Sequence, residues 1–120
     1  MFKLAIPVLY VKSITVAEEF YCNRLGFTQR FAHRNDDTKA DPCYMGLGRD
    51  SARLHISSYP GDAGTGSGAV ITVDDIDALH QELLRKDVSI GMPPTDQDWG
   101  NREMSVKDPD GNRITFVRPV

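Results

Sequence analysis

The chain has 120 residues, a length at which we expect one domain with its own hydrophobic core. Apolar residues make up 40% and charged residues 26%, and 17 acidic against 14 basic side chains give a formal net charge of -3. This balance argues against a nucleic-acid-binding protein, which usually carries a basic patch.

The first half of the sequence predicts a strand, a helix and three further strands. Residues 2–11 are apolar and β-branched, and Pro7 among them indicates an edge strand or a break. Helical spacing follows between Ser13, a suitable N-cap, and Gly26, which stands where a helix C′ residue belongs. The three strands that end this half are expected at residues 27–33, 43–48 and 52–57.

The second half repeats this order after a glycine-rich break at residues 59–68. A strand is expected at 68–73, followed by a helix at 74–86 with acids in its first turn and bases in its last. Residues 88–100 predict a short strand and then a loop. The half ends with a predicted hairpin whose strands are residues 101–108 and 112–117.

The two halves align as an internal repeat. Residues 11–14 correspond to residues 73–76 at an offset of 62. Residues 52–56 correspond to residues 112–116 at an offset of 60. Each half therefore contains one βαβββ unit.

This repeat predicts an α+β fold of two βαβββ modules packed about a pseudo-twofold axis. Module one covers about residues 1–60 and module two about residues 67–120, within a single domain of residues 1–120. Duplicated mixed sheets of this kind can curve around a shared cleft, and clefts are where small ligands usually bind.

The predicted hairpin turns at DPDG, residues 108–111. Its acids lack the ligand spacing and the terminal glutamate of a calcium-binding loop. Pro109 at the second position and Gly111 at the fourth suit a type I turn that begins at Asp108. The aspartates are therefore predicted to shape the hairpin and not to act in catalysis.

The cysteines and the amino-terminal segment indicate an intracellular protein. Cys22 and Cys43 fit neither a disulfide framework nor a zinc motif, and we expect buried free thiols in a reducing cytosol. The apolar run before Lys12 is too short for a signal peptide and far too short to span a bilayer. We expect a cytoplasmic protein without membrane contacts.

Four segments carry a resemblance to a known family: FYCNRLGF at 20–27, LHIS at 54–57, DIDALHQELL at 75–84 and WGNREMSVKDPDGNRITF at 99–116. With these segments and the duplicated βαβββ order, the chain resembles the glyoxalase/bleomycin resistance/dioxygenase superfamily, the vicinal oxygen chelate proteins, over essentially its whole length. Within that superfamily it looks most like the bleomycin resistance proteins, which are similar in fold to the enzymes but bind the drug without chemistry.

The resemblance places the four metal-ligand positions of the superfamily's enzymes at Ile6, His55, Gly68 and Thr115. Divalent first-row metals need imidazole, carboxylate or thiolate donors, commonly three from the protein at a catalytic site. Only His55 is such a donor, so the sequence predicts neither a metal nor another cofactor and argues against an enzyme. The alternative is a metal-dependent glyoxalase- or dioxygenase-like enzyme with a shifted ligand set that uses His55 and Glu103.

Seven side chains are candidates for contacts with a small ligand. His55 alternates with Leu54 and Ile56, so it faces the cleft if those two enter the core, or else it hydrogen-bonds a neighbour on the sheet face. Trp99 offers a stacking surface to a flat heteroaromatic ligand, or it packs on its own strand. The other candidates, each of which also suits a core or solvated position, are Phe31, Tyr44, Asp98, Arg102 and Glu103.

We therefore predict a metal-free protein that sequesters a small molecule, a bleomycin-type antibiotic in the leading hypothesis. Such drugs are cationic, and Asp98 or Glu103 would contact the positive tail. The resemblance also implies a homodimer that exchanges its first strands and has two ligand grooves at the interface, with Pro7 as the hinge. A sequestering protein for an unrelated metabolite fits the sequence equally.

Overall fold

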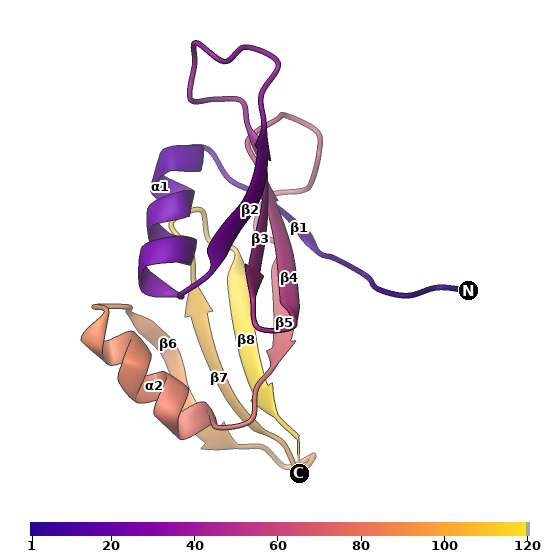
Figure 1. Cartoon of the computed structure of the whole chain (residues 1–120). Coiled ribbons are helices and arrows are strands. Elements are labelled where there is room, and N and C mark those ends of the chain that lie inside the picture. The colour runs from indigo at the N-terminus through magenta and orange to yellow at the C-terminus, as the bar shows by residue number, and fades with distance from the viewer. Residues whose placement is uncertain (120) are drawn as a thin grey trace.

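The computed structural model describes residues 1–119 and divides them into two modules (Figure 1). Module one forms a four-stranded sheet, sheet one, with the strand order β1-β4-β3-β2, in which only β1 and β4 are parallel. Its helix continues from α1 into a π-helical turn, η1. The elements are β1 (Val8–Tyr10), α1 (Ile14–Glu18), η1 (Glu19–Arg24), β2 (Thr28–His33), β3 (Tyr44–Arg49) and β4 (Ala52–Ser57).

Module two repeats this arrangement in sheet two, with the strand order β5-β8-β7-β6 and a parallel pair of β5 and β8. Its elements are β5 (Gly68–Thr72), α2 (Ile76–Arg85), β6 (Ile90–Asp96), β7 (Arg102–Lys107) and β8 (Arg113–Arg118). The α+β prediction and the duplicated βαβββ order are confirmed.

Two of the predicted strands differ from the observed ones. The first strand was expected over residues 2–11, but β1 has three residues, and the preceding segment runs away from the sheets (Figure 1). Pro7 has no N–H with which to continue the ladder, although its carbonyl accepts a bond from His55 N at 3.0 Å. Within residues 88–100, where a short strand and a loop were expected, β6 extends to Asp96, because an edge strand with an irregular register tolerates Pro93 and Pro94.

Both helices begin at side-chain caps that the sequence supplies. The Ser13 hydroxyl accepts a hydrogen bond from Val16 N at 3.2 Å, and the Asp75 carboxylate accepts one from Ala78 N at 3.0 Å. Gly26 adopts a φ of 77° directly after the first helix, as the C′ position requires. Across residues 1–119, no helix is both long and apolar enough to cross a membrane.

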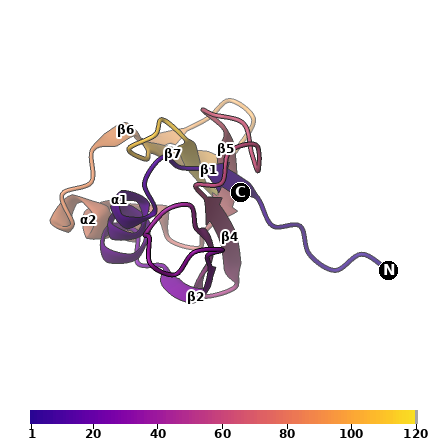
Figure 2. The same ribbon diagram turned by 90° about the horizontal axis from the view of Figure 1, so that it is seen from above.

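The helices pack on one side of the two sheets and leave the other side uncovered (Figures 1 and 2). Alternate strand residues enter the buried core on the helix side, among them Met45, Leu47, Leu54, Ile56, Met104, Val106, Ile114 and Phe116. The intervening residues point away from the helices, because side chains alternate along a strand. We call these uncovered surfaces the open faces of sheet one and sheet two.

A buried polar network at the 108–111 turn connects the modules. Gly111 N donates to Asp108 O at 3.0 Å, which confirms the predicted turn. The Asp108 carboxylate accepts bonds from the Tyr21 hydroxyl at 2.7 Å and from Asn112 Nδ2 at 2.8 Å. Burial, followed by the nearby Asp108 charge, raises the pKa of Tyr21 far above its ordinary value, so its hydroxyl remains a donor.

Asn112 extends the network to both modules and to the linker. Its side-chain Nδ2 also donates to Tyr10 O at 2.8 Å, and its Oδ1 accepts from Ser67 N at 3.0 Å. Asn112 and Asp108 are both buried, so removal of the Asn112 side chain leaves the Asp108 carboxylate without one of its donors.

We expect Asn112→Ala to lower the free energy of unfolding by about 3 kcal/mol, because the buried Asp108 carboxylate and two part-buried main-chain groups lose their partner at once. Urea denaturation of wild type and variant measures the change. Asp110→Ala in the same turn is the control, because its contact with Lys12 N is exposed and should contribute less than about 1 kcal/mol. Equal losses in the two variants would contradict a stabilising role for the buried network.

Candidate functional site

Three of the predicted site residues form an aromatic cluster on the open face of sheet one. The rings of Phe31 and Tyr44 are nearly parallel, with an interplanar angle of 11° and centroids 6.3 Å apart. The His55 ring lies edge-on to both, 5.3 Å from each centroid. Phe31 is 45% exposed although it is a large apolar side chain. The cluster therefore offers ring surface to a molecule outside this chain.

A hydrogen bond fixes the polar side of this cluster. The Tyr44 hydroxyl and His55 Nδ1 are 2.8 Å apart. Desolvation lowers the pKa of His55 below the ordinary histidine value of 6.5 and raises the pKa of Tyr44. Both groups are therefore neutral near pH 7. Leu54 and Ile56 are buried in the core, so His55 points to the opposite face of β4, and there it hydrogen-bonds the neighbouring Tyr44.

Gly46 makes room for the aromatic cluster. It is the register partner of both His55 and Phe31, so it lies between them in the middle of the open face. A Cβ atom at Gly46 would lie 2.1 Å from Phe31 Cε1, inside van der Waals contact. Phe31 can lie flat over β3 only because residue 46 has no side chain.

The next row of the same face carries two arginines. Gly48 is the register partner of Arg53, and a β-bulge in β2 brings Arg30 beside them. A Cβ at Gly48 would lie 2.9 Å from Arg30 Cδ and 3.0 Å from Arg53 Nη1. The two cationic side chains therefore share the space above this glycine. The sequence contained a signal for the space above these two glycines, since Tyr44, Gly46 and Gly48 alternate along one strand face.

The open face of sheet two is less aromatic and carries a carboxylate. Register pairs Val70 with Thr115, Thr115 with Ser105, and Glu103 with Val117, which places these side chains on one face. The indole Nε1 of Trp99, from the turn before β7, donates to Glu103 Oε2 at 2.9 Å. Trp99 remains 68% exposed. Two of the predicted residues are thus in direct contact here.

The structure does not bring Arg102 and Asp98 into either group. Arg102 shares the helix-side face of β7 with buried Met104, and its guanidinium pairs with Asp77 of α2 at 2.9 Å and with Asp96 at 3.1 Å. It lies on the opposite face from Glu103 because adjacent strand residues alternate. Asp98 is exposed in the turn between β6 and β7.

The four positions that a metal would need do not present a suitable donor set. Val8, and not Ile6, is the register partner of His55, and Val70, and not Gly68, is the partner of Thr115. Neither the expected nor the observed partners supply a nitrogen, carboxylate or thiolate ligand. Within residues 1–119, no group of three or more His, Cys, Asp or Glu side chains could hold a metal ion. The residues present therefore do not fit the metal of the superfamily's enzymes.

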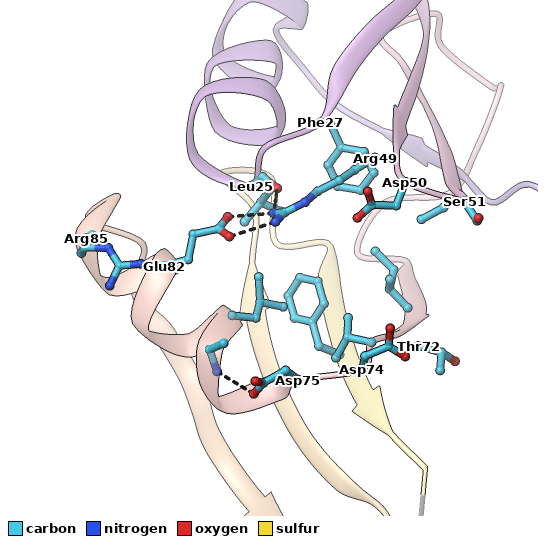
Figure 3. Close-up of a pocket in the computed structure, with 16 residues that line it drawn as sticks. Leu25, Phe27, Arg49, Asp50, Ser51, Thr72, Asp74, Asp75, Glu82 and Arg85 are labelled. Atoms are coloured by element: carbon cyan, nitrogen blue, oxygen red, sulfur yellow. Dashed lines mark hydrogen bonds and ion pairs between the residues drawn. The ribbon is translucent and has the colours of Figure 1, made fainter.

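A cavity of about 580 Å³ lies elsewhere, between the modules on the helix side (Figure 3). Arg49 of β3 crosses it to form a two-bond ion pair with Glu82 of α2, at 2.7 and 2.8 Å. Arg49 also donates to Leu25 O at 2.9 Å, and its bonds to Glu82 hold the pKa of that carboxyl below its usual range. None of the seven predicted residues lines this cavity, so it is separate from the open faces.

Comparisons with known proteins agree on one family. The family model described as Glyoxalase/Bleomycin resistance protein/Dioxygenase superfamily matches residues 3–116. Bleomycin resistance proteins from Geobacillus stearothermophilus and from Staphylococcus aureus are each 31% identical, over 97% of this chain and 96% of theirs. The crystal structure of a bleomycin-binding protein from Streptomyces verticillus, complexed with copper(II)-bleomycin, is 31% identical with a TM-score of 0.77 and covers 100% of this chain and 98% of that one.

We expect Gly46→Ala to displace Phe31 from the aromatic cluster while the protein stays folded, because an exposed ring can swing away from the new methyl group. NMR should show altered ring-current shifts at His55 and Tyr44, with the free energy of unfolding changed by less than about 1 kcal/mol. Gly64→Ala is the control, since its Cβ would meet only Ser67 Oγ, at 4.0 Å. Unchanged shifts in Gly46→Ala would contradict the role assigned to this glycine.

Proposed function

Since this chain belongs to the Glyoxalase/Bleomycin resistance protein/Dioxygenase superfamily, we propose that it binds and sequesters a small-molecule antibiotic of the bleomycin type. The observation that carries the proposal is the exposed aromatic cluster of Phe31, Tyr44 and His55 on an uncovered sheet face. Relatives that are bleomycin resistance and bleomycin-binding proteins, similar over nearly the whole chain, support the same ligand class.

The mechanism we propose is binding alone, without a catalytic step. The aromatic cluster removes a flat ring system from water, and the neutral His55–Tyr44 pair supplies polar contacts beside it. Trp99 is proposed as a second stacking surface. Its bond to Glu103 leaves that carboxylate available to a positive group of the drug. A bound antibiotic is withdrawn from solution and cannot reach its target.

We also propose that the working form is a homodimer. The helices leave both open faces uncovered, and a ligand site gains burial when a second copy closes over it (Figure 1). The segment before β1 supports this assembly, because Phe2 is 104% exposed and Leu4 66% exposed in the isolated chain. The exchange of this segment between subunits would bury these side chains.

Isothermal titration calorimetry with bleomycin tests the ligand. We expect saturable binding at micromolar concentrations or below, and at least about tenfold weaker binding by Phe31→Ala because the stacking surface is lost. Leu84→Ala is the matched control, since Leu84 on α2 has the same 45% exposure as Phe31.

Two results would contradict the proposal. If the wild-type protein does not bind bleomycin at high micromolar concentration, this drug is not the ligand. If purified protein contains a stoichiometric transition metal that His55→Ala loses, the metal-free binding mechanism is wrong.

Light scattering after size-exclusion chromatography tests the dimer. We expect the wild-type protein to be a dimer. The double variant Phe2→Ser/Leu4→Ser should have a larger dimer dissociation constant, because the exchanged segment loses its apolar contacts. Its thermal unfolding as a monomer should change little, since both side chains are exposed in one subunit. A wild-type protein that is monomeric at high micromolar concentration would refute this assembly.

A further inference from the structure

Among the residues that the structure describes, no acidic side chain pairs with the two arginines beside the aromatic cluster. Within residues 1–119, the ion pairs of arginines involve Arg24, Arg49 and Arg102, and neither Arg30 nor Arg53 takes part in one. The chain as a whole carries a net charge of -3, so acidic side chains are not scarce. Two cationic side chains that share one space without a carboxylate repel each other and attract an anion.

Main-chain carbonyl groups hold Arg53 in place. Its Nη1 donates to Asp50 O and to Ala52 O, both at 2.9 Å. These two bonds use one of its three nitrogens and leave the others free for a ligand. Arg53 is also half-buried, so its side chain loses less conformational freedom on binding than an exposed arginine would.

The arginine pair and the aromatic cluster lie side by side on one face. Arg53 and His55 are two residues apart on β4, a spacing of roughly 7 Å along an extended strand. Gly48 and Gly46 lie beside them in the same order on β3. A molecule of two fused rings has about this length, so its ring system can cover the aromatic cluster while a substituent reaches the arginines.

We propose that Arg30 and Arg53 bind an acidic group, such as a carboxylate, sulfonate or phosphate, on an aromatic ligand whose ring lies on the aromatic cluster. The planar fork of donors on a guanidinium matches the oxygens of these groups. The proposal rests on the proposed function, because it takes the open face of sheet one as the ligand-binding surface. It adds a charge requirement for one part of the ligand: the group that lies over this row is acidic, while a positive group of the same ligand can contact Glu103 on sheet two.

A pair of fluorescent probes with the same ring system tests this charge requirement in the full-length protein. 8-Anilinonaphthalene-1-sulfonate carries a sulfonate, and N-phenyl-1-naphthylamine is its uncharged counterpart. We expect Arg53→Gln and Arg30→Gln each to weaken binding of the sulfonate about five- to tenfold and to change binding of the neutral probe less than about twofold. Phe31→Ala should weaken binding of both probes.

Arg118→Gln is the matched control, because it removes the same charge from the exposed end of β8 and should change neither affinity. The arginine subsite is refuted if Arg53→Gln weakens both probes equally or neither. It is also refuted if Arg53→Gln dissociates the dimer but leaves the preference for the sulfonate over the neutral probe unchanged. The arginine would then pair with a carboxylate of the second subunit and not with a ligand.

Calorimetry with bleomycin separates this inference from the proposed function. If the wild-type protein does not bind bleomycin but binds the sulfonate in a way that depends on Arg30 and Arg53, the bleomycin assignment is refuted and the arginine subsite is supported. A protein that binds bleomycin but takes up the sulfonate independently of Arg30 and Arg53 refutes the subsite alone.

Discussion

The buried carboxylate of Asp108 is the contact on which the arrangement of the two modules depends. It accepts bonds from the Tyr21 hydroxyl of module one and from the Asn112 amide, which in turn holds Tyr10 O at the end of β1 and Ser67 N in the linker. A buried charge that loses one of these donors keeps its full desolvation cost, so the network forms as a unit. The modules are thereby joined on the helix side, where the Arg49–Glu82 pair adds a second connection (Figure 3).

Because the junction and both helices lie on that side, each sheet retains one uncovered face. The composition of these faces follows from strand alternation. On sheet one, β3 places glycine at positions 46 and 48 between the outward-facing residues of β2 and β4. The glycines remove the middle row of side chains, so Phe31 and Arg53 can lie over the bare strand. The same two positions with larger residues would give an ordinary solvated sheet surface.

Local chemistry explains which features the sequence could predict. The Ser13 cap, the 108–111 turn and the outward side of His55 each depend on neighbouring residues, and all three appear in the structure. Charge makes Arg102 a site candidate, but the structure places it on the same face of β7 as buried Met104 and so on the helix side. The proximity of Arg30 and Arg53 could not be predicted, because it depends on a bulge that shifts the register of β2 against β3.

The repeat also determines what kind of chemistry the open faces favour. Equivalent strand pairs set Val8 beside His55 in one module and Val70 beside Thr115 in the other. Three of these four side chains cannot supply a strong ligand to a divalent metal. The fourth, an imidazole with a lowered pKa, is bonded to a tyrosine hydroxyl and packed edge-on against two rings. Such a histidine contributes shape and a neutral polar edge, so the affinity of this face should come from ring contact and from the charges beside it.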